Sequence, residues 1–256
     1  MQFLDGYPFP IRLAATAMRQ AHLSLSNLRC RLQANPQGTL RYPGDAEDRE
    51  TSLAATLDLS YTILPPNAQR AFMVLALFPA GLTRNAAQTI LHLADETLET
   101  VVRYGMAEWR GHADYAQCAL PEPARCYAED RLARHIPDAF AQCAPATLVY
   151  VANLIEANDE AIINGNERTA ITILTLEQPN LTRYLDWGYD HDTESNGVNR
   201  AARATARLGH YWMLKGERSR PEVLARLERA LTAARRSNDR LGEANTLKAI
   251  GDVQQF

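Results

Sequence analysis

The chain has 256 residues, 46% apolar and 22% charged, so it is long enough to bury a core. Its formal net charge of −3 gives no general attraction to nucleic acid or to anionic membranes. No apolar run approaches the ~18 residues of a membrane span, and no basic segment leads into an apolar signal core at the N-terminus. These features predict a cytoplasmic protein without a membrane partner.

Cysteines and histidines form no pattern that is typical of a metal site. The four cysteines are far apart and include no C-x-x-C pair, and the six histidines include no H-E-x-x-H motif. We expect reduced, mostly buried thiols and no bound metal.

The first segment, 1–34, has apolar residues at helical spacing over 9–32. Ser24 or Ser26 is suited to cap a second helix there. Two prolines, two glycines and several charges then predict a linker over 35–50, which would be the first domain boundary.

Residues 51–136 predict short helices followed by a β-hairpin. Pro65 and Pro66 should end the first helix, while Thr83 and Asp95 are candidate caps of the third and fourth. Gly105 can take a left-handed turn before two alternating stretches, MAEWR and YAQCAL, that read as strands around GHAD. Helices followed by such a hairpin indicate a winged helix.

A winged helix raises the hypothesis of a DNA-binding transcription regulator. The helix before the hairpin would read the groove, yet its sequence ADETLETVVRY is acidic, whereas contact with phosphates requires basic residues. We therefore expect this module to pack against protein, and keep DNA binding as an alternative.

The remainder, 137–256, is predicted to be helical throughout. One long helix covers about 138–163, two short helices broken at Pro179 with Asn180 as a cap cover 170–189, and three helices follow from 198 to the end. A weak echo 42 positions apart places Gly209 and Gly251 inside helices, where glycine usually marks close approach of a neighbouring helix. This predicts irregular tetratricopeptide-like hairpins.

Nothing in the sequence predicts catalysis by this chain. There is no G-x-x-x-x-G-K-S/T loop, and neither of the two lysines, Lys215 and Lys248, follows a glycine-rich loop. Acidic pairs four residues apart are expected to be solvated helix surface rather than an acid site. These pairs are Glu156 with Glu160 and Asp186 with Asp190.

Three stretches together resemble signal-transduction ATPases with numerous domains, the STAND class that includes NB-ARC proteins. GYPFPIRLAATAM resembles the Gly-x-Pro motif and its following helix, and TSLAATLDLSYTILPPNAQRAFMVLALFPAG resembles the start of the winged helix. LEQPNLTRYLDWGY, with GHYWMLKGE and LERALTAAR, is similar to the helical-repeat sensor region of bacterial regulators. The P-loop domain of that family would precede Met1, so the resemblance implies the C-terminal part of a larger ATPase.

The resemblance also implies nucleotide-contacting positions. Gly6 and Pro8 match the motif whose proline packs on adenine in the family, where ADP or ATP is the cofactor. Leu120, Pro121 and Glu122 match a Met-His-Asp motif near the β-phosphate, but Pro121 cannot replace the histidine donor. Residual ADP or ATP binding is therefore a second alternative.

The sequence thus predicts a mainly α protein: an ARC-like helical segment, a winged helix over 51–136, and tetratricopeptide-like hairpins over 137–256. We expect a non-catalytic regulatory fragment that needs no cofactor of its own, relays the nucleotide state of an absent nucleotide-binding domain, and binds a protein partner or ligand on its repeats. An apolar face of helix 9–20 should then be uncovered. Between Arg200 and Arg240 ten arginines and Lys215 face four acids, which suggests either an acidic partner or, as we favour, solvated helix faces.

Overall fold

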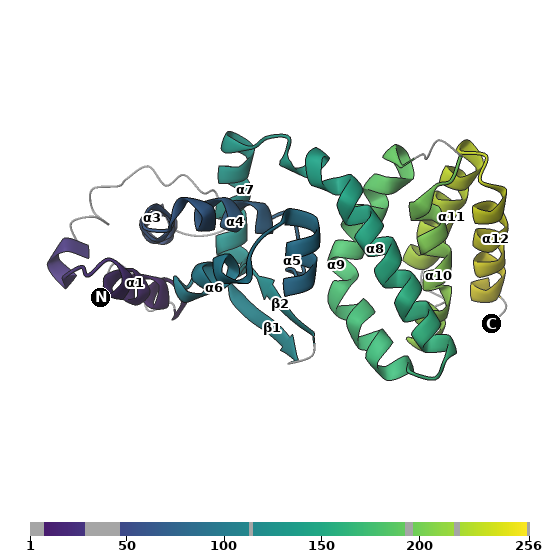
Figure 1. Cartoon of the computed structure of the whole chain (residues 1–256), viewed down its shortest axis with the longest axis horizontal. Helices are drawn as coiled ribbons and strands as arrows, with labels where there is room; N and C mark the ends of the chain where they lie inside the picture. The colour runs from purple at the N-terminus through teal and green to yellow at the C-terminus, as the bar shows by residue number, and fades with distance from the viewer. Residues whose placement is uncertain (1–7, 29–46, 113–114, 193–196, 218–220, 255–256) are drawn as a thin grey trace. The chain divides into compact units, whose positions relative to one another are not determined.

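Helices make up most of the chain, and a two-stranded antiparallel sheet completes it, which confirms the mainly α prediction with a β-hairpin (Figure 1). The structure is a computed structural model. It divides into two compact units, Met1–Ala139 and Phe140–Phe256, which are taken in turn below. The residues it describes are 8–28, 47–112, 115–192, 197–217 and 221–254.

In the first unit short helices precede the β-hairpin, in the predicted order. Leu82 forms an isolated bridge to Cys118, which adds a third strand position beside the hairpin. Trp109 pairs with Cys118 across the hairpin, so the strands are in register as expected for two adjacent antiparallel segments. The elements are α1 (Pro8–Gln20), α3 (Glu47–Thr62), α4 (Pro66–Leu75), α5 (Arg84–Leu91), α6 (Asp95–Arg103), β1 (Glu108–His112), β2 (Tyr115–Ala119) and α7 (Glu122–His135).

Local signals explain most of these boundaries. The Thr83 hydroxyl accepts a hydrogen bond from the Ala86 amide at 3.2 Å, and Gly105 has a left-handed φ of 75°, both as predicted. Asp95 is not a cap, because Ala94 occupies the N-cap position without a side-chain hydrogen bond and Asp95 begins the helix. At this position the positive end of the helix dipole still stabilises its carboxylate.

Helix α1 has no uncovered apolar face among its described side chains, contrary to expectation. Leu13, Ala14 and Ala17 are at most 2% exposed, because α1 packs against α3. The Ser24 hydroxyl caps the short helical stretch 25–28 by accepting from the Asn27 amide at 3.2 Å. Helix α3 begins at Glu47, inside the segment expected to be linker; the rest of that linker lies outside the described residues.

A polar clamp joins α3 to α7. Asp58 accepts a hydrogen bond from the Tyr127 hydroxyl at 2.7 Å and pairs with Arg131. The Arg131 guanidinium also lies 5.1 Å from the ring centroids of Tyr61 and Tyr127. Burial raises the pKa of Tyr127, so its hydroxyl stays protonated as the donor.

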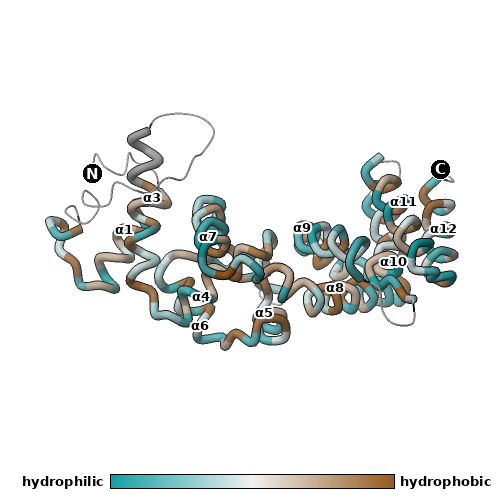
Figure 2. The backbone as a smooth tube through the Cα atoms, turned by 90° about the horizontal axis from the view of Figure 1, so that it is seen from above, coloured by the Kyte–Doolittle hydropathy of each residue, from teal (hydrophilic) through white to brown (hydrophobic). Residues whose placement is uncertain are grey.

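The second unit consists of helices that alternate apolar and polar stretches, as helices with one buried face do (Figure 2). Helix α9 is continuous, whereas a break at Pro179 was predicted. Pro179 is exposed, while Leu174, Leu181 and Tyr184 are buried and keep the helix packed on both sides of it. The helices are α8 (Ala139–Ile163), α9 (Glu167–His191), α10 (Arg200–Leu214), α11 (Pro221–Arg236) and α12 (Arg240–Gln254).

Asn180 is therefore not a helix cap. It is 2% exposed in the middle of α9, and its amide donates to the Glu177 carboxylate at 2.8 Å. The tertiary contacts of the apolar residues override the local signal of Pro179.

Neighbouring helices approach closely at Gly188 of α9, a position that was not predicted from the sequence. A Cβ there would lie 2.7 Å from the Ala201 Cβ and 2.8 Å from Leu148 Cδ2. At Gly209 a Cβ would be 3.5 Å from the Ala249 Cβ, so α12 is the neighbour that the echo predicted. Gly251 has nothing within 4 Å, so the same prediction is wrong there.

A buried carboxylate joins the ends of three helices. Asp239 is 4% exposed and receives Arg203 Nε at 2.8 Å and Nη2 at 2.7 Å. It also accepts the amides of Asn199 at 3.2 Å and Gly242 at 3.0 Å, so it binds the starts of α10 and α12 together. Burial opposes the charge, but these hydrogen bonds outweigh it and lower the pKa of Asp239.

Replacing Gly188 by alanine should destabilise the second unit by about 2 kcal/mol, because the new methyl group overlaps Ala201 and Leu148. Gly209→Ala is the matched control. Its methyl group meets Ala249 at ordinary contact distance, and removal of a helical glycine should leave stability equal or raise it by up to ~1 kcal/mol. Urea denaturation followed by circular dichroism measures both, and equal effects would contradict the packing described.

Asp239→Asn should lower the free energy of unfolding at pH 7 by about 2–3 kcal/mol, because Arg203 loses its buried partner. Since the folded-state pKa lies below the ordinary 3.8, the carboxylate stabilises the fold above that pH and the stabilisation is lost as the pH falls through the folded pKa. The difference between variant and parent should therefore shrink below about pH 4.

The control is Asp190→Asn. Its pair with Arg236 is more than half exposed on both sides, so a change below ~0.5 kcal/mol is expected. A variant–parent difference for Asp239 that is constant from pH 7 to pH 2 would rule out the assigned role.

Candidate ligand pocket in the helical unit

The residues that the family resemblance assigns to nucleotide contact lie only partly within the described residues. Gly6 lies outside the described residues, and Pro8 is described only as the first residue of α1. Glu122 begins α7 and is exposed. Of these three residues, only Glu122 has a described side chain.

Glu122 is engaged by its own helix. Its Oε1 and Oε2 accept from Arg125 Nη2 at 2.6 Å and from Nε at 3.2 Å. The hydrogen bonds from Arg125 lower the pKa of Glu122, so the side chain is an anion at neutral pH. Arg125 also binds Glu129 at 2.7 Å, and the cluster offers a phosphate group more negative than positive charge.

Three of the four acidic side chains singled out on the helices of the second unit form ion pairs with arginines. Glu156 binds Arg207 at 2.5 Å, and Asp190 lies 3.2 Å from Arg236. Asp186 is shared by Arg226 at 3.3 Å and Arg229 at 2.9 Å.

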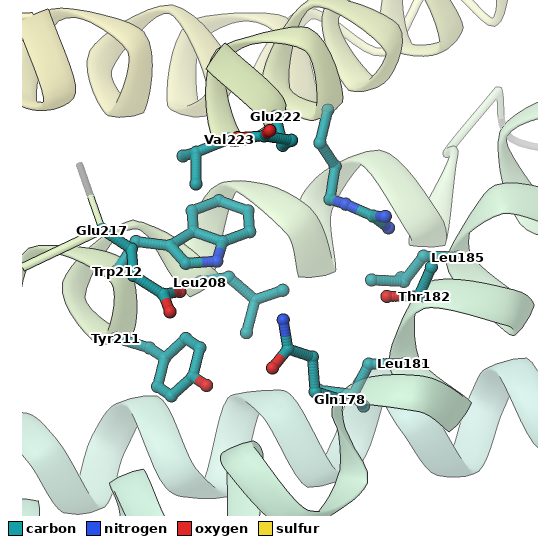
Figure 3. A pocket seen from close by; sticks show the side chains of 11 residues that line it. Gln178, Leu181, Thr182, Leu185, Leu208, Tyr211, Trp212, Glu217, Glu222 and Val223 are labelled. Carbon is teal, nitrogen blue, oxygen red and sulfur yellow. The ribbon is translucent and has the colours of Figure 1, made fainter. Parts of the chain in front are cut away.

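A pocket of about 340 Å³ opens between α9, α10 and α11 (Figure 3). This volume lies at the lower end of the range for small-molecule sites. It combines an apolar floor with a few polar groups, which is the usual composition of such sites. The lining residues are Gln178, Leu181, Thr182, Leu185, Leu208, Tyr211, Trp212, Glu217, Glu222, Val223 and Arg226.

The floor follows from helical spacing. Leu181 and Leu185 are one turn apart on α9 and are both buried, and Leu208 and Trp212 are one turn apart on α10. Figure 3 shows the Trp212 indole facing the space above Leu208. These side chains present a flat apolar surface to an occupant.

The aromatic wall is fixed by hydrogen bonding. The Tyr211 hydroxyl lies 3.1 Å from Thr175 Oγ1 on α9, and Tyr211 is 2% exposed. The ammonium of Lys215 lies 5.3 Å from the Tyr211 ring centroid. The hydrogen bond to Thr175 holds the end of α10 against α9, whereas the Lys215 contact lies within the C-terminal turn of α10.

The turn after α10 brings an acid to the pocket. Gly216 has a φ of 71°, and the Glu217 amide returns to the Trp212 carbonyl at 2.9 Å, which ends the helix with a left-handed residue. Glu217 Oε1 lies 3.3 Å from Lys215 Nζ, so that carboxylate is already paired.

The pocket has a small excess of negative charge. Glu217 is paired with Lys215, and Arg226 is paired with Asp186, whereas Glu222 is exposed and has no ion pair among the described residues. Its carboxylate is the charge available to an occupant. The indole face of Trp212 also favours cations over anions.

Comparisons with protein-family models, with curated proteins and with solved structures find no match to this chain. Within the described residues, no group of His, Cys, Asp and Glu side chains is suited to hold a metal ion, and no helix is long and apolar enough to cross a membrane.

The three described cysteines are free thiols, in accord with the expectation of reduced cysteines. Cys118 and Cys143 are buried, and burial raises the pKa of Cys118 to about 12. Such a thiol is a poor nucleophile at neutral pH.

The pocket was not predicted, because its residues come from three helices. Trp212, Glu217 and Glu222 received no role from the sequence. The local signal is the run Tyr211-Trp212 followed by Gly216 and Glu217, which puts two aromatic rings beside a chain reversal.

Trp212→Ala should destabilise the second unit by about 3 kcal/mol, because the indole is 5% exposed and supports α10 against its neighbours. Trp187→Ala is the control. That indole is half-buried and stacks on His191 with ring centroids 5.0 Å apart, so a loss of about 1 kcal/mol is expected. Urea denaturation measures both losses, and the reverse order would contradict the position of Trp212.

Proposed function

We propose that the chain is a non-catalytic regulatory module that binds a small organic cation in the pocket between α9, α10 and α11. The proposal is supported by one observation above all: a pocket of about 340 Å³ with an apolar floor has Glu222 among its lining residues, as a carboxylate without an ion pair among the described residues. An aromatic or aliphatic body would lie on Trp212 and Leu208, and its ammonium group would approach Glu222.

We further propose that the module belongs to a STAND-type signalling ATPase, as the motifs GYPFP and SYTILPPNAQRAFMVLALFPAG suggest. In such a protein the P-loop domain binds ADP or ATP, and occupation of the pocket would bias its state. The net excess of acid around the pocket argues against an anionic nucleotide as its occupant.

The alternative function is DNA binding by a winged helix in the first unit. The charges on α6 argue against DNA binding. The exposed side of α6 carries Asp95, Glu96 and Glu99. The nearby Arg84 is paired with Glu99, and its guanidinium stacks 4.2 Å above the Trp109 ring. A phosphate backbone would meet acids there.

The test uses the single-tryptophan protein with Trp109→Phe and Trp187→Phe, which leaves Trp212 as the reporter. Three probes share one body: phenethylamine, 2-phenylethanol and phenylacetate. Fluorescence titration should show the amine as the tightest ligand and the carboxylate as the weakest. Glu222→Gln should weaken the amine about threefold and leave the alcohol unchanged.

Glu228→Gln is the matched control, because Glu228 is exposed on the same helix and does not line this pocket. No fluorescence change with any probe would overturn the pocket assignment. Calorimetry with ADP and a salt series with duplex DNA test the two alternatives, and binding of either would replace the proposal for the chain's role.

A further inference from the structure

Helix α12 packs on α10 and α11 through one face, and its other face is open to solvent (Figure 1). The buried residues Gly242, Thr246, Ala249 and Val253 mark the packed side. On the other side Leu241 is 57% exposed and Leu247 is 45% exposed. Leu241 and Leu247 lie about 120° apart around the helix axis, so they flank the solvent-facing side of α12.

The open face of α12 carries a projecting leucine side chain and an unfilled space beside a glycine. Leu241 projects from the first turn, while Gly251 in the last turn has nothing within 4 Å of the position that a Cβ would take. Ala244 lies between them on the same side and is exposed. A leucine of a neighbouring helix would fit over Gly251, as the Ala249 methyl group fits over Gly209 inside the unit.

The face is also symmetric about one point. Successive residues of a helix turn by about 100°, so positions 241, 244, 248 and 251 all lie within about 40° of the direction opposite buried Thr246. A two-fold axis there relates position 241 to 251, 244 to 248, and 240 to 252. Each pair of numbers adds to the same sum, which is the condition for facing residues in antiparallel helices.

The charges at the ends of this face are complementary under that symmetry. Arg240 is exposed and has no ion pair among the described residues. Asp252 pairs with Lys248 of its own helix at 3.5 Å and remains partly exposed. In an antiparallel pair, Arg240 of one copy would face Asp252 of the other at both ends.

We propose that this face binds a second copy of the chain, through an antiparallel α12–α12 contact in which Leu241 of each copy packs over Gly251 of the other. Arg240 and Asp252 fix the register. The contact is isologous, so it closes as a dimer and does not propagate. It is independent of the pocket and of the function proposed for it.

Sedimentation equilibrium of the full chain over 5–200 µM should show a reversible monomer–dimer equilibrium. Leu241→Glu should weaken the dimer at least tenfold. Leu214→Glu changes a leucine of similar exposure, 45%, on α10 and should leave the equilibrium unchanged. A monomer at every concentration, or a dimer that tolerates Leu241→Glu, would overturn the proposal.

The register is tested separately by charge reversal. Arg240→Asp and Asp252→Arg should each weaken the dimer, and the double variant should restore it. A double variant that dimerises no better than the single variants would contradict the antiparallel register.

A cysteine pair gives a direct geometric readout. Positions 241 and 251 are about 15 Å apart along one helix, so Leu241→Cys with Gly251→Cys cannot form a disulfide within a chain. Mild oxidation should therefore give a disulfide-linked dimer on a non-reducing gel. Leu241→Cys with Leu247→Cys, whose positions do not face each other, is the control, and the parent chain with its native cysteines sets the background. Equal yields from both pairs would contradict the proposal.

Discussion

The second unit depends on the buried carboxylate of Asp239. It holds Arg203 of α10 and the first amides of α10 and α12, so three chain segments meet at one charge. Asn199 extends the group, since its side chain accepts the Ala202 amide at 2.8 Å and donates to the Asp192 carbonyl at 2.7 Å. The positions of the pocket walls and of the open α12 face both follow from this joint.

Charge pairing explains why a basic sequence does not give a basic surface. Between Arg200 and Arg240 most described arginines bind a carboxylate of the same unit. Arg207 reaches Glu156 and buried Asp159, which also binds His210 at 2.7 Å and so links α8 to α10. The excess of arginine therefore serves the packing of the helices, and an acidic macromolecular partner is not required to account for it.

Interactions between neighbours in sequence were predictable, and interactions across the fold were not. Thr83 and Gly105 act within three residues of themselves, so their roles could be read from the chain. Pro179 carries an equally strong local signal, yet Leu181 and Tyr184 hold the helix straight through it by contacts with other helices. The pocket combines side chains from three helices, and no spacing along the sequence indicates that Glu222 and Trp212 meet.

Because Asp239 binds the starts of both α10 and α12, local unfolding of one of these helices is coupled to local unfolding of the other. Loss of the carboxylate contacts frees the starts of α10 and α12 at once, so these helices should exchange their amide hydrogens as one cooperative unit rather than one by one. Occupation of the space beside Trp212 would then slow exchange as far away as α12.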